Sequence, residues 1–175
     1  IQIKNALFEG AFAQPFSGIL EYRPNAELKD GSGSVAKLEF EAGLYMNGHG
    51  PCIPAMNVLR CLQDGATRIK RGRDVPRGIR PAEPTAKLIY DGPRDVEGMW
   101  KQYQEFSIRK GVVVSGRRVT RTRPQFKTWA AFLPIAADEN IWDLDDLRQS
   151  WDLAGRYAGL GDMRPYFGQF EATME

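Results

Sequence analysis

The sequence predicts an α+β fold, and three observations support this prediction. Two segments carry apolar residues at helical spacing, several others alternate apolar and polar residues as half-buried strands do, and the elements follow the order strand, helix, strand, strand, helix, strand. This order matches the ferredoxin-like (split βαβ) plan, in which two helices pack on one face of an antiparallel sheet. A chain of 175 residues has the length of one domain. We expect residues 1–175 to form a single ferredoxin-like domain with basic elaborations, a hairpin and a loop, at about 71–104 and 109–127.

The first third of the chain is predicted to contain two strands and the first helix. Residues 1–12 begin with apolar–polar alternation, which is typical of a strand. Residues 29–34 are rich in Gly and Ser and predict a turn, and the alternation over 36–46 predicts a half-buried strand. A helix is expected over 54–70, because apolar residues recur at intervals of three and four: Met56, Leu59, Leu62, Ala66 and Ile69. Gly65 costs this helix about 1 kcal/mol relative to alanine, unless close packing requires it.

The middle of the chain is predicted to form a loop, a short strand and a hairpin. Residues 71–84 hold several prolines and glycines and indicate a long basic loop, followed by a short strand around 87–90. Residues 106–114 and 119–126 flank Ser115–Gly116, a sequence typical of a tight turn. We expect a hairpin with arginines on its tip and second arm.

The last third is predicted to contain a buried strand over 128–135, the second helix over 143–158 and a final strand over 170–174. Asp143 is a favourable N-cap, and two further aspartates lie in the first turn, where the helix dipole favours negative charge. The apolar stripe of this helix is formed by Leu144, Leu147, Trp151, Ala154 and Ala158. Glycines at 159 and 161 are expected to end it.

The basic residues are concentrated, although the formal net charge is only +2. Thirteen of the 24 lysines and arginines lie within residues 68–80 and 109–127, where Asp74 is the one acidic residue. Residues 138–152 are predominantly acidic, so we expect a dipolar molecule. Clustered arginine is typical of a polyanion-binding face, and we expect nucleic-acid contacts from Arg68, Lys70, Arg71, Arg73, Arg77, Arg80, Arg117, Arg118, Arg121, Arg123, Lys127 and Arg164. The alternatives are a solvated charged surface, or basic and acidic faces that meet between copies.

Few residues suggest catalysis. His49, the one histidine, lies between two glycines at a strand-to-helix junction and is the candidate general base, although a histidine in a turn is more often structural or merely exposed. Asp30 could activate a ribose hydroxyl or hold a metal, but an aspartate beside a glycine more often forms a turn. Cys52 and Cys61 lack the spacing of a zinc site, and no phosphate-binding glycine loop is present. We expect no metal and no cofactor.

The composition indicates a cytoplasmic protein. The longest uncharged apolar stretch, residues 128–137, is too short to span a bilayer and contains a proline. No secretory leader opens the sequence, and two cysteines are too few for a disulfide framework.

The most distinctive segment is the Gly-rich loop, residues 159–170, between the second helix and the last strand. Gly159, Gly161 and Gly168 permit backbone conformations that other residues resist. Arg164 could contact a phosphate, and the aromatic pair at 166–167 could stack on a base. A plain helix-to-strand connection is an equally good interpretation from spacing alone.

A Gly-rich loop with an arginine, joining the last helix to the last strand of a ferredoxin-like domain, resembles the signature of the repeat-associated mysterious protein (RAMP) superfamily. That superfamily includes the backbone subunits of CRISPR surveillance complexes. Residues 121–126, 154–155 and 161–165 also resemble small phage-encoded proteins. The resemblance implies a subunit that binds RNA without cutting it, or an endoribonuclease, in the host cytoplasm if the chain is phage-encoded.

Three functions therefore stay open. The first is a non-catalytic protein that binds single-stranded nucleic acid, RNA in preference to DNA, and oligomerises along it as a backbone-type subunit, alone or in a multi-subunit assembly. The second is a metal-independent endoribonuclease with His49 as its base. The third is a phage virion or assembly protein that self-associates through oppositely charged poles.

Overall fold

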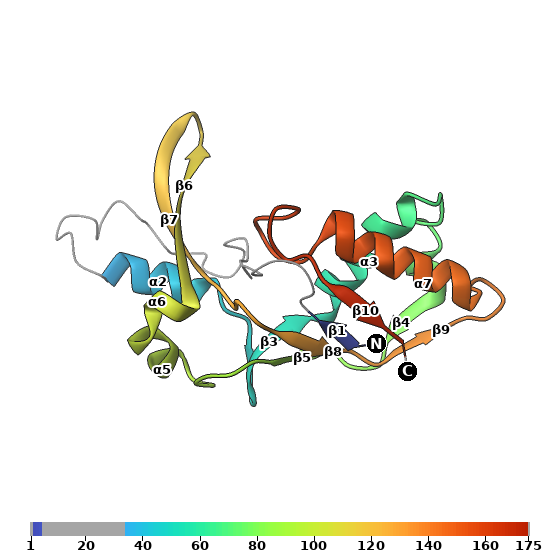
Figure 1. Ribbon diagram of the computed structural model, residues 1–175, viewed down its shortest axis with the longest axis horizontal. Coiled ribbons are helices and arrows are strands. Elements are labelled where there is room, and N and C mark those ends of the chain that lie inside the picture. The colour runs from blue at the N-terminus through green and yellow to red at the C-terminus, as the bar shows by residue number, and fades with distance from the viewer. Residues whose placement is uncertain (1, 5–33, 175) are drawn as a thin grey trace.

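The computed structural model describes residues 2–4 and 34–174 and has an α+β fold built on an antiparallel sheet (Figure 1). Six strands form this sheet in the order β10–β1–β8–β5–β3–β2, and every neighbouring pair is antiparallel. Their bounds are β1 Gln2–Lys4, β2 Met46–Asn47, β3 Gly50–Pro54, β5 Thr85–Ile89, β8 Ala130–Phe132 and β10 Glu171–Thr173. The predicted α+β class with an antiparallel sheet is confirmed.

Two smaller sheets and a set of helices complete the described chain. The smaller sheets pair β4 (Ile79–Pro81) with β9 (Ile135–Ala137), and β6 (Ser107–Val114) with β7 (Arg117–Pro124). The longer helices are α2 (Ser34–Ala42), α3 (Ala55–Thr67) and α7 (Leu144–Leu153), which continues into the π-helical turn η2 (Ala154–Ala158). The short ones are α4 (Val75–Gly78), α5 (Val96–Lys101) and α6 (Tyr103–Phe106).

Helices α3 and α7 lie side by side on the same side of the large sheet (Figure 1). They were both predicted, and the middle residues of their stripes are buried. The first-turn residues Met56 and Leu144 are exposed, Ala158 is partly buried, and Ile69 is partly buried and lies beyond the end of α3. Asp143 is the N-cap of α7, since its carboxylate accepts a hydrogen bond from the Asp146 N–H at 2.7 Å. The core between the helices and the sheet includes Val58, Leu62, Leu88, Ala131, Leu147 and Trp151.

The strand predicted over 36–46 is wrong, because most of this segment is helix α2. The alternation is typical of a strand, but the segment is made mainly of Ala, Lys, Leu and Glu, which favour helix, and this preference prevails over the pattern. Helix α2 buries Glu39 and Phe40, neighbours in sequence that would face opposite ways in a strand. The strand predicted over 1–12 and the turn over 29–34 lie largely outside the described residues, although β1 agrees with the start of the former.

Two other predictions need correction. Residues 71–84 are not one loop, since they contain α4 and β4, and β4 pairs with β9 far along the chain. The single strand predicted over 128–135 is divided into β8 and β9, which belong to different sheets. Pro134 lies at the break, where its missing N–H prevents a continuous ladder. The predicted hairpin over 106–126 is confirmed, with Ser115 and Gly116 at its tip.

Candidate nucleic-acid interface

The structure places the two basic segments far apart. Residues 68–80 run from the end of α3 through α4 to β4, and the hairpin β6–β7 carries the second segment. Figure 1 shows β4 near the right end of the molecule's longest axis and the hairpin toward the left end. They do not form the two walls of one groove.

The first basic segment packs against the acidic one, residues 138–146. Arg71 lies at the centre of this contact: it binds the carboxylates of Asp74 at 2.7 Å and Asp146 at 2.5 Å, donates to the carbonyl of Ile141, and stacks over the Trp142 ring at 4.9 Å. The β4–β9 pairing and a hydrogen bond from the Asp138 N–H to the Gly78 carbonyl continue it. The prediction that 68–80 and the acidic residues form opposite poles is therefore wrong, because 68–80 and 138–146 lie at the same end and offset each other's charge.

Other basic residues of this segment also have contacts within the protein. Arg68 lies over the Tyr157 ring at 4.6 Å, and Arg80 donates to the carbonyls of Pro76 and Ile79. Arg77 is 3.9 Å from the Asp74 carboxylate. Lys70 and Arg73 are exposed.

The hairpin carries the second basic segment into solvent. Arg109, Lys110 and Arg118 are exposed on it. Arg121, in contrast, pairs at 2.6 Å with Glu39 of α2, a carboxylate that is only 4% exposed and also accepts from the Thr122 N–H at 2.7 Å. Arg121 therefore docks the hairpin on α2. Arg117 belongs to β7, and its side chain lies outside the described part of the structure.

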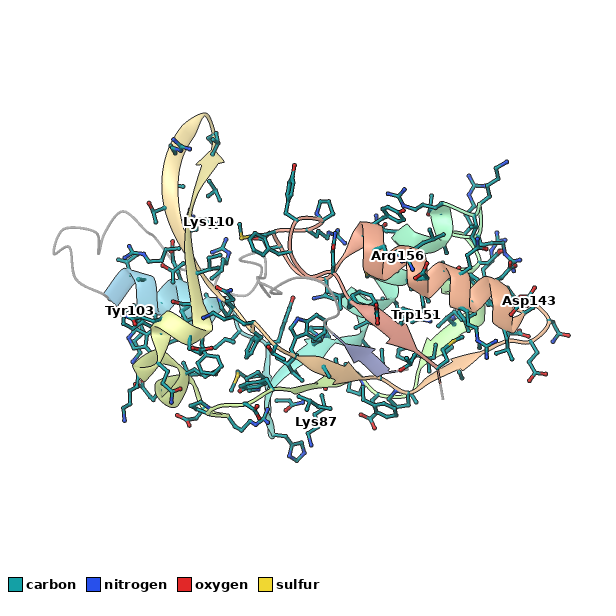
Figure 2. The ribbon with its side chains drawn as sticks, in the orientation of Figure 1. Lys87, Tyr103, Lys110, Asp143, Trp151 and Arg156 are labelled. Carbon is teal, nitrogen blue, oxygen red and sulfur yellow. The ribbon has the colours of Figure 1, made fainter. Side chains whose placement is uncertain are left out.

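The base of the hairpin touches the Gly-rich loop. Arg123 is 3.3 Å from the Asp162 carboxylate, and the Lys110 ammonium lies 5.4 Å from the centre of the Phe167 ring. Figure 2 shows Lys110 on the hairpin and Asp143 at the other end of the molecule. Two elements that the sequence analysis treated separately thus form one continuous surface. Lys127, beyond the end of β7, is 3.7 Å from Glu105.

The Gly-rich loop needs its glycines. Gly159, Gly161 and Gly168 all have positive φ, at 71°, 96° and 76°. Gly168 also lies so close to Leu160 that a Cβ would be 1.7 Å from the Leu160 carbonyl oxygen, and the Leu160 N–H donates to the Gly168 carbonyl at 2.8 Å. The predicted conformational role of these glycines is confirmed.

Arg164 and Tyr166 lie at the outer end of this loop. Arg164 is 3.3 Å from Asp64 of α3, which is also 3.2 Å from Arg60, so two guanidinium groups share one carboxylate. Tyr166 is 86% exposed, the arrangement expected of an aromatic ring that stacks on a ligand rather than on the core. The loop therefore presents cationic and aromatic groups together.

Sequence analysis missed how the loop is held from beneath. The turn η2 ends with the Gly159 N–H donating to the Ala154 carbonyl at 2.8 Å, and the Cys61 thiol donates to the Gly159 carbonyl at 3.1 Å. Burial raises the pKa of this thiol from 9.0 to about 12, so it remains a neutral donor. Gly155 allows the next chain segment to approach, because a Cβ there would lie 2.0 Å from the Phe170 carbonyl oxygen. A lone cysteine inside a helical stripe gives no local signal of this contact.

The structure describes one of the two catalytic candidates. His49 is exposed in the turn between β2 and β3, and its backbone N–H is bound by the Asn47 side chain at 2.9 Å. Asp30 lies outside the described residues. Within residues 2–4 and 34–174, no group of three or more His, Cys, Asp or Glu side chains is arranged to hold a metal ion. Over the same residues, no helix has the length and apolar character needed to cross a bilayer.

Comparison with known proteins gives no relative. No protein-family model matches the chain, and no curated protein or solved structure is similar to it.

Proposed function

We propose that this protein binds single-stranded nucleic acid, RNA in preference to DNA, without cutting it, and that it oligomerises along its ligand as a backbone-type subunit. The observation that carries the proposal is the contact between the basic hairpin and the Gly-rich loop. Lys110 and Arg123 on one side, and Phe167 and Asp162 on the other, join the two into one surface. Exposed cations that follow a backbone, next to exposed aromatic rings that stack on bases, are the usual elements of single-strand binding.

The distribution of charge also favours the hairpin and the Gly-rich loop as the nucleic-acid contact. The basic residues of 68–80 lie against the acidic segment, so their field is largely offset there. Arg109, Lys110 and Arg118 stand on a projecting hairpin instead. Both segments keep exposed cations, but those of 68–80 lie beside the acidic segment, which weakens their attraction for phosphate. We therefore assign the main contact to the hairpin and the loop beside it.

We propose a ferredoxin-like fold as the finer description. Taken as a set, β1, α3, β5, β8, α7 and β10 follow the order strand, helix, strand, strand, helix, strand. Since β8 is antiparallel to both β1 and β5, these two strands are parallel and separated by β8, as a split βαβ unit requires. Strands β2 and β3 then extend the sheet beyond β5. This arrangement agrees with the RAMP resemblance, which we retain as a proposal.

The test is fluorescence anisotropy with labelled single-stranded RNA and DNA of one sequence, measured across a salt series. If about five phosphates are neutralised, log K should fall with log salt at a slope near −3.5, using roughly −0.7 for each contact. Replacing Arg109, Lys110 and Arg118 together by alanine should make the slope shallower by about 2, and should weaken all sequences alike.

The matched control removes three charges at the other end of the molecule: Lys70→Ala, Arg73→Ala and Arg77→Ala. We expect it to bind almost as the unmodified protein does. Equal loss in both variants would mean that binding follows net charge rather than this surface. Absence of binding by the unmodified protein at low salt would refute the proposal, and RNA cleavage that disappears in His49→Ala would favour the endoribonuclease.

Oligomerisation is tested by light scattering with and without the oligonucleotide. We expect assembly that grows with ligand length. Assembly without nucleic acid, leaving a bound oligonucleotide unprotected, would favour the virion or assembly protein. The close packing of 68–80 against 138–146 within one chain reduces the charge available for such head-to-tail contacts.

A further inference from the structure

A pocket of about 540 Å³ lies at the base of the hairpin, outside the surface that we assign to the nucleic-acid backbone. It forms where the end of β5, the end of α6 and the segment after β7 meet, so it is lined by residues 89–91, 105–106 and 126–130. Its volume is in the range of about 300–1,000 Å³ that is typical of small-ligand sites.

The buried wall of the pocket is a rigid aromatic cluster. The rings of Tyr90, Phe106 and Phe126 pack edge-to-face, with centroids between 4.7 and 6.0 Å apart, and each residue is almost fully buried. Gly92 makes close packing possible here, because a Cβ at this position would be 2.3 Å from the Phe106 ring. At the mouth, Ile89 is 43% exposed and offers an apolar surface to a ligand. The aromatic rings therefore form an apolar floor, and Ile89 is the more exposed apolar side chain of the lining.

The polar groups of the pocket are few and are placed together. The Lys127 ammonium and the Glu105 carboxylate, 3.7 Å apart, present a hydrogen-bond donor beside an acceptor, and both side chains remain partly exposed. Asp91, Thr128 and Trp129, which carries an indole N–H, also line the pocket. With two carboxylates and one ammonium, the lining has a net negative charge, which repels a phosphate. The pocket therefore suits the base of a nucleotide and not its phosphate.

We propose that this pocket binds one guanine base of the single strand, an inference that rests on the proposed function. On the Watson–Crick edge of guanine, the O6 acceptor lies next to the N1–H and N2–H₂ donors. Lys127 would donate to O6, and Glu105 would accept from N1–H and N2–H₂. Uracil offers Glu105 a single N–H, and adenine offers a single amino group beside a ring-nitrogen acceptor, so neither satisfies the carboxylate as fully. Glu105 and Lys127 lie two residues before β6 and three after β7, which brings the pocket to the foot of the basic arm.

The test compares four RNA 12-mers: all uridine, and uridine with one central guanosine, inosine or adenosine. We expect the guanosine strand to bind about 5- to 150-fold more tightly than the uridine and adenosine strands, which corresponds to 1–3 kcal/mol for a good bidentate base contact. Inosine lacks the N2 amino group and should be intermediate. Glu105→Gln should remove the preference for the guanosine strand over the other three. The control is Glu97→Gln. Glu97 is an exposed carboxylate of α5 that pairs with Lys37 of α2, and this variant should keep the preference for guanosine.

The outcomes separate this inference from the proposed function. If all four strands bind equally well with the expected salt slope, the guanine assignment is overturned and the function stands. If no strand binds at low salt, the function fails, and guanosine 5′-monophosphate is titrated alone by NMR. Shifts confined to the pocket and lost in Glu105→Gln would then support a guanine site. No shifts, or shifts equal to those with uridine 5′-monophosphate, would overturn it.

Discussion

Gly65 sets how closely α3 approaches α7, and replacing it by alanine tests the helix packing. In an isolated helix, Gly65→Ala would be stabilising by about 1 kcal/mol. In this protein an added Cβ would lie 2.5 Å from both the Ala154 nitrogen and the Ser150 carbonyl oxygen, backbone atoms that cannot rotate away. Overpacking of this kind costs roughly 1–3 kcal/mol. Because the contact is with backbone on both sides, we expect the upper part of that range and a net loss of about 1–2 kcal/mol.

Urea unfolding monitored by tryptophan fluorescence measures this loss. Gly48→Ala is the matched control, since nothing lies within 4 Å of a Cβ there, and it should change the free energy of unfolding by less than about 0.5 kcal/mol. Because η2 leads into the Gly-rich loop, Gly65→Ala should also weaken nucleic-acid binding. A Gly65→Ala protein as stable as the unmodified one, or more stable, would show that the two helices do not meet as closely as described.

Three further predictions concern stability and pH. Leu147→Ala, in the core under α7, should cost about 2–5 kcal/mol in the same urea assay, and a negligible change would mean that the buried face of α7 is misassigned. Arg71→Ala should cost about 1–3 kcal/mol, because it leaves Asp146 and the Ile141 carbonyl without this donor and removes the shorter of the two ion pairs of Asp74, yet should not change the salt slope of nucleic-acid binding. Burial raises the pKa of the Cys61 thiol from 9.0 to about 12, so the folded state retains the thiol proton more strongly than the unfolded state does. The stabilisation of the fold by this group is complete below pH 9. As the pH rises from 9 toward 12, the free energy of unfolding falls by up to about 1.4 kcal/mol per pH unit. The pH dependence of the urea midpoint above pH 9 should therefore be shallower in Cys61→Ala, and an unchanged dependence would contradict the burial of this thiol.

Elements with strong local signals could be predicted from the sequence. The stripes of α3 and α7, the Asp143 cap and the Ser115–Gly116 turn all act over a few residues, and the structure contains each of them. The positive φ values of the loop glycines follow from the same local reasoning. Helix α2 was predicted as a strand because its apolar residues alternate strictly with polar ones. The helix preference of its residues and the burial of Glu39 beside Phe40 through contacts with distant parts of the chain override that pattern.

Contacts between distant residues could not be predicted. Glu39 and Arg121 are 82 positions apart in the sequence, and Arg71 and Asp146 are 75 positions apart. The residues around each of these side chains therefore give no sign of its partner. This is why the basic residues of 68–80 and the acidic residues of 138–146 were expected at opposite poles. Clustering along the chain showed where charge was abundant but not which charges face each other. The Lys110–Phe167 contact, which joins the hairpin to the loop, was hidden for the same reason.

In the part of the chain that the structure describes, the contacts that attach the hairpin to the body come from its lower half. Thr122, Arg121 and Arg123 make the contacts with Glu39 and Asp162, while the distal residues between Gly111 and Thr120 pair only with one another across the ladder, among the contacts described here. An isolated pair of strands has little stability of its own. The outer part of the hairpin therefore extends the protein into solvent without stabilising the rest of the fold. The length and charge of the outer hairpin can therefore change over evolution with little effect on folding of the rest of the protein. A hairpin shortened at the Gly111–Thr120 pair would leave a protein that can carry a different outer hairpin.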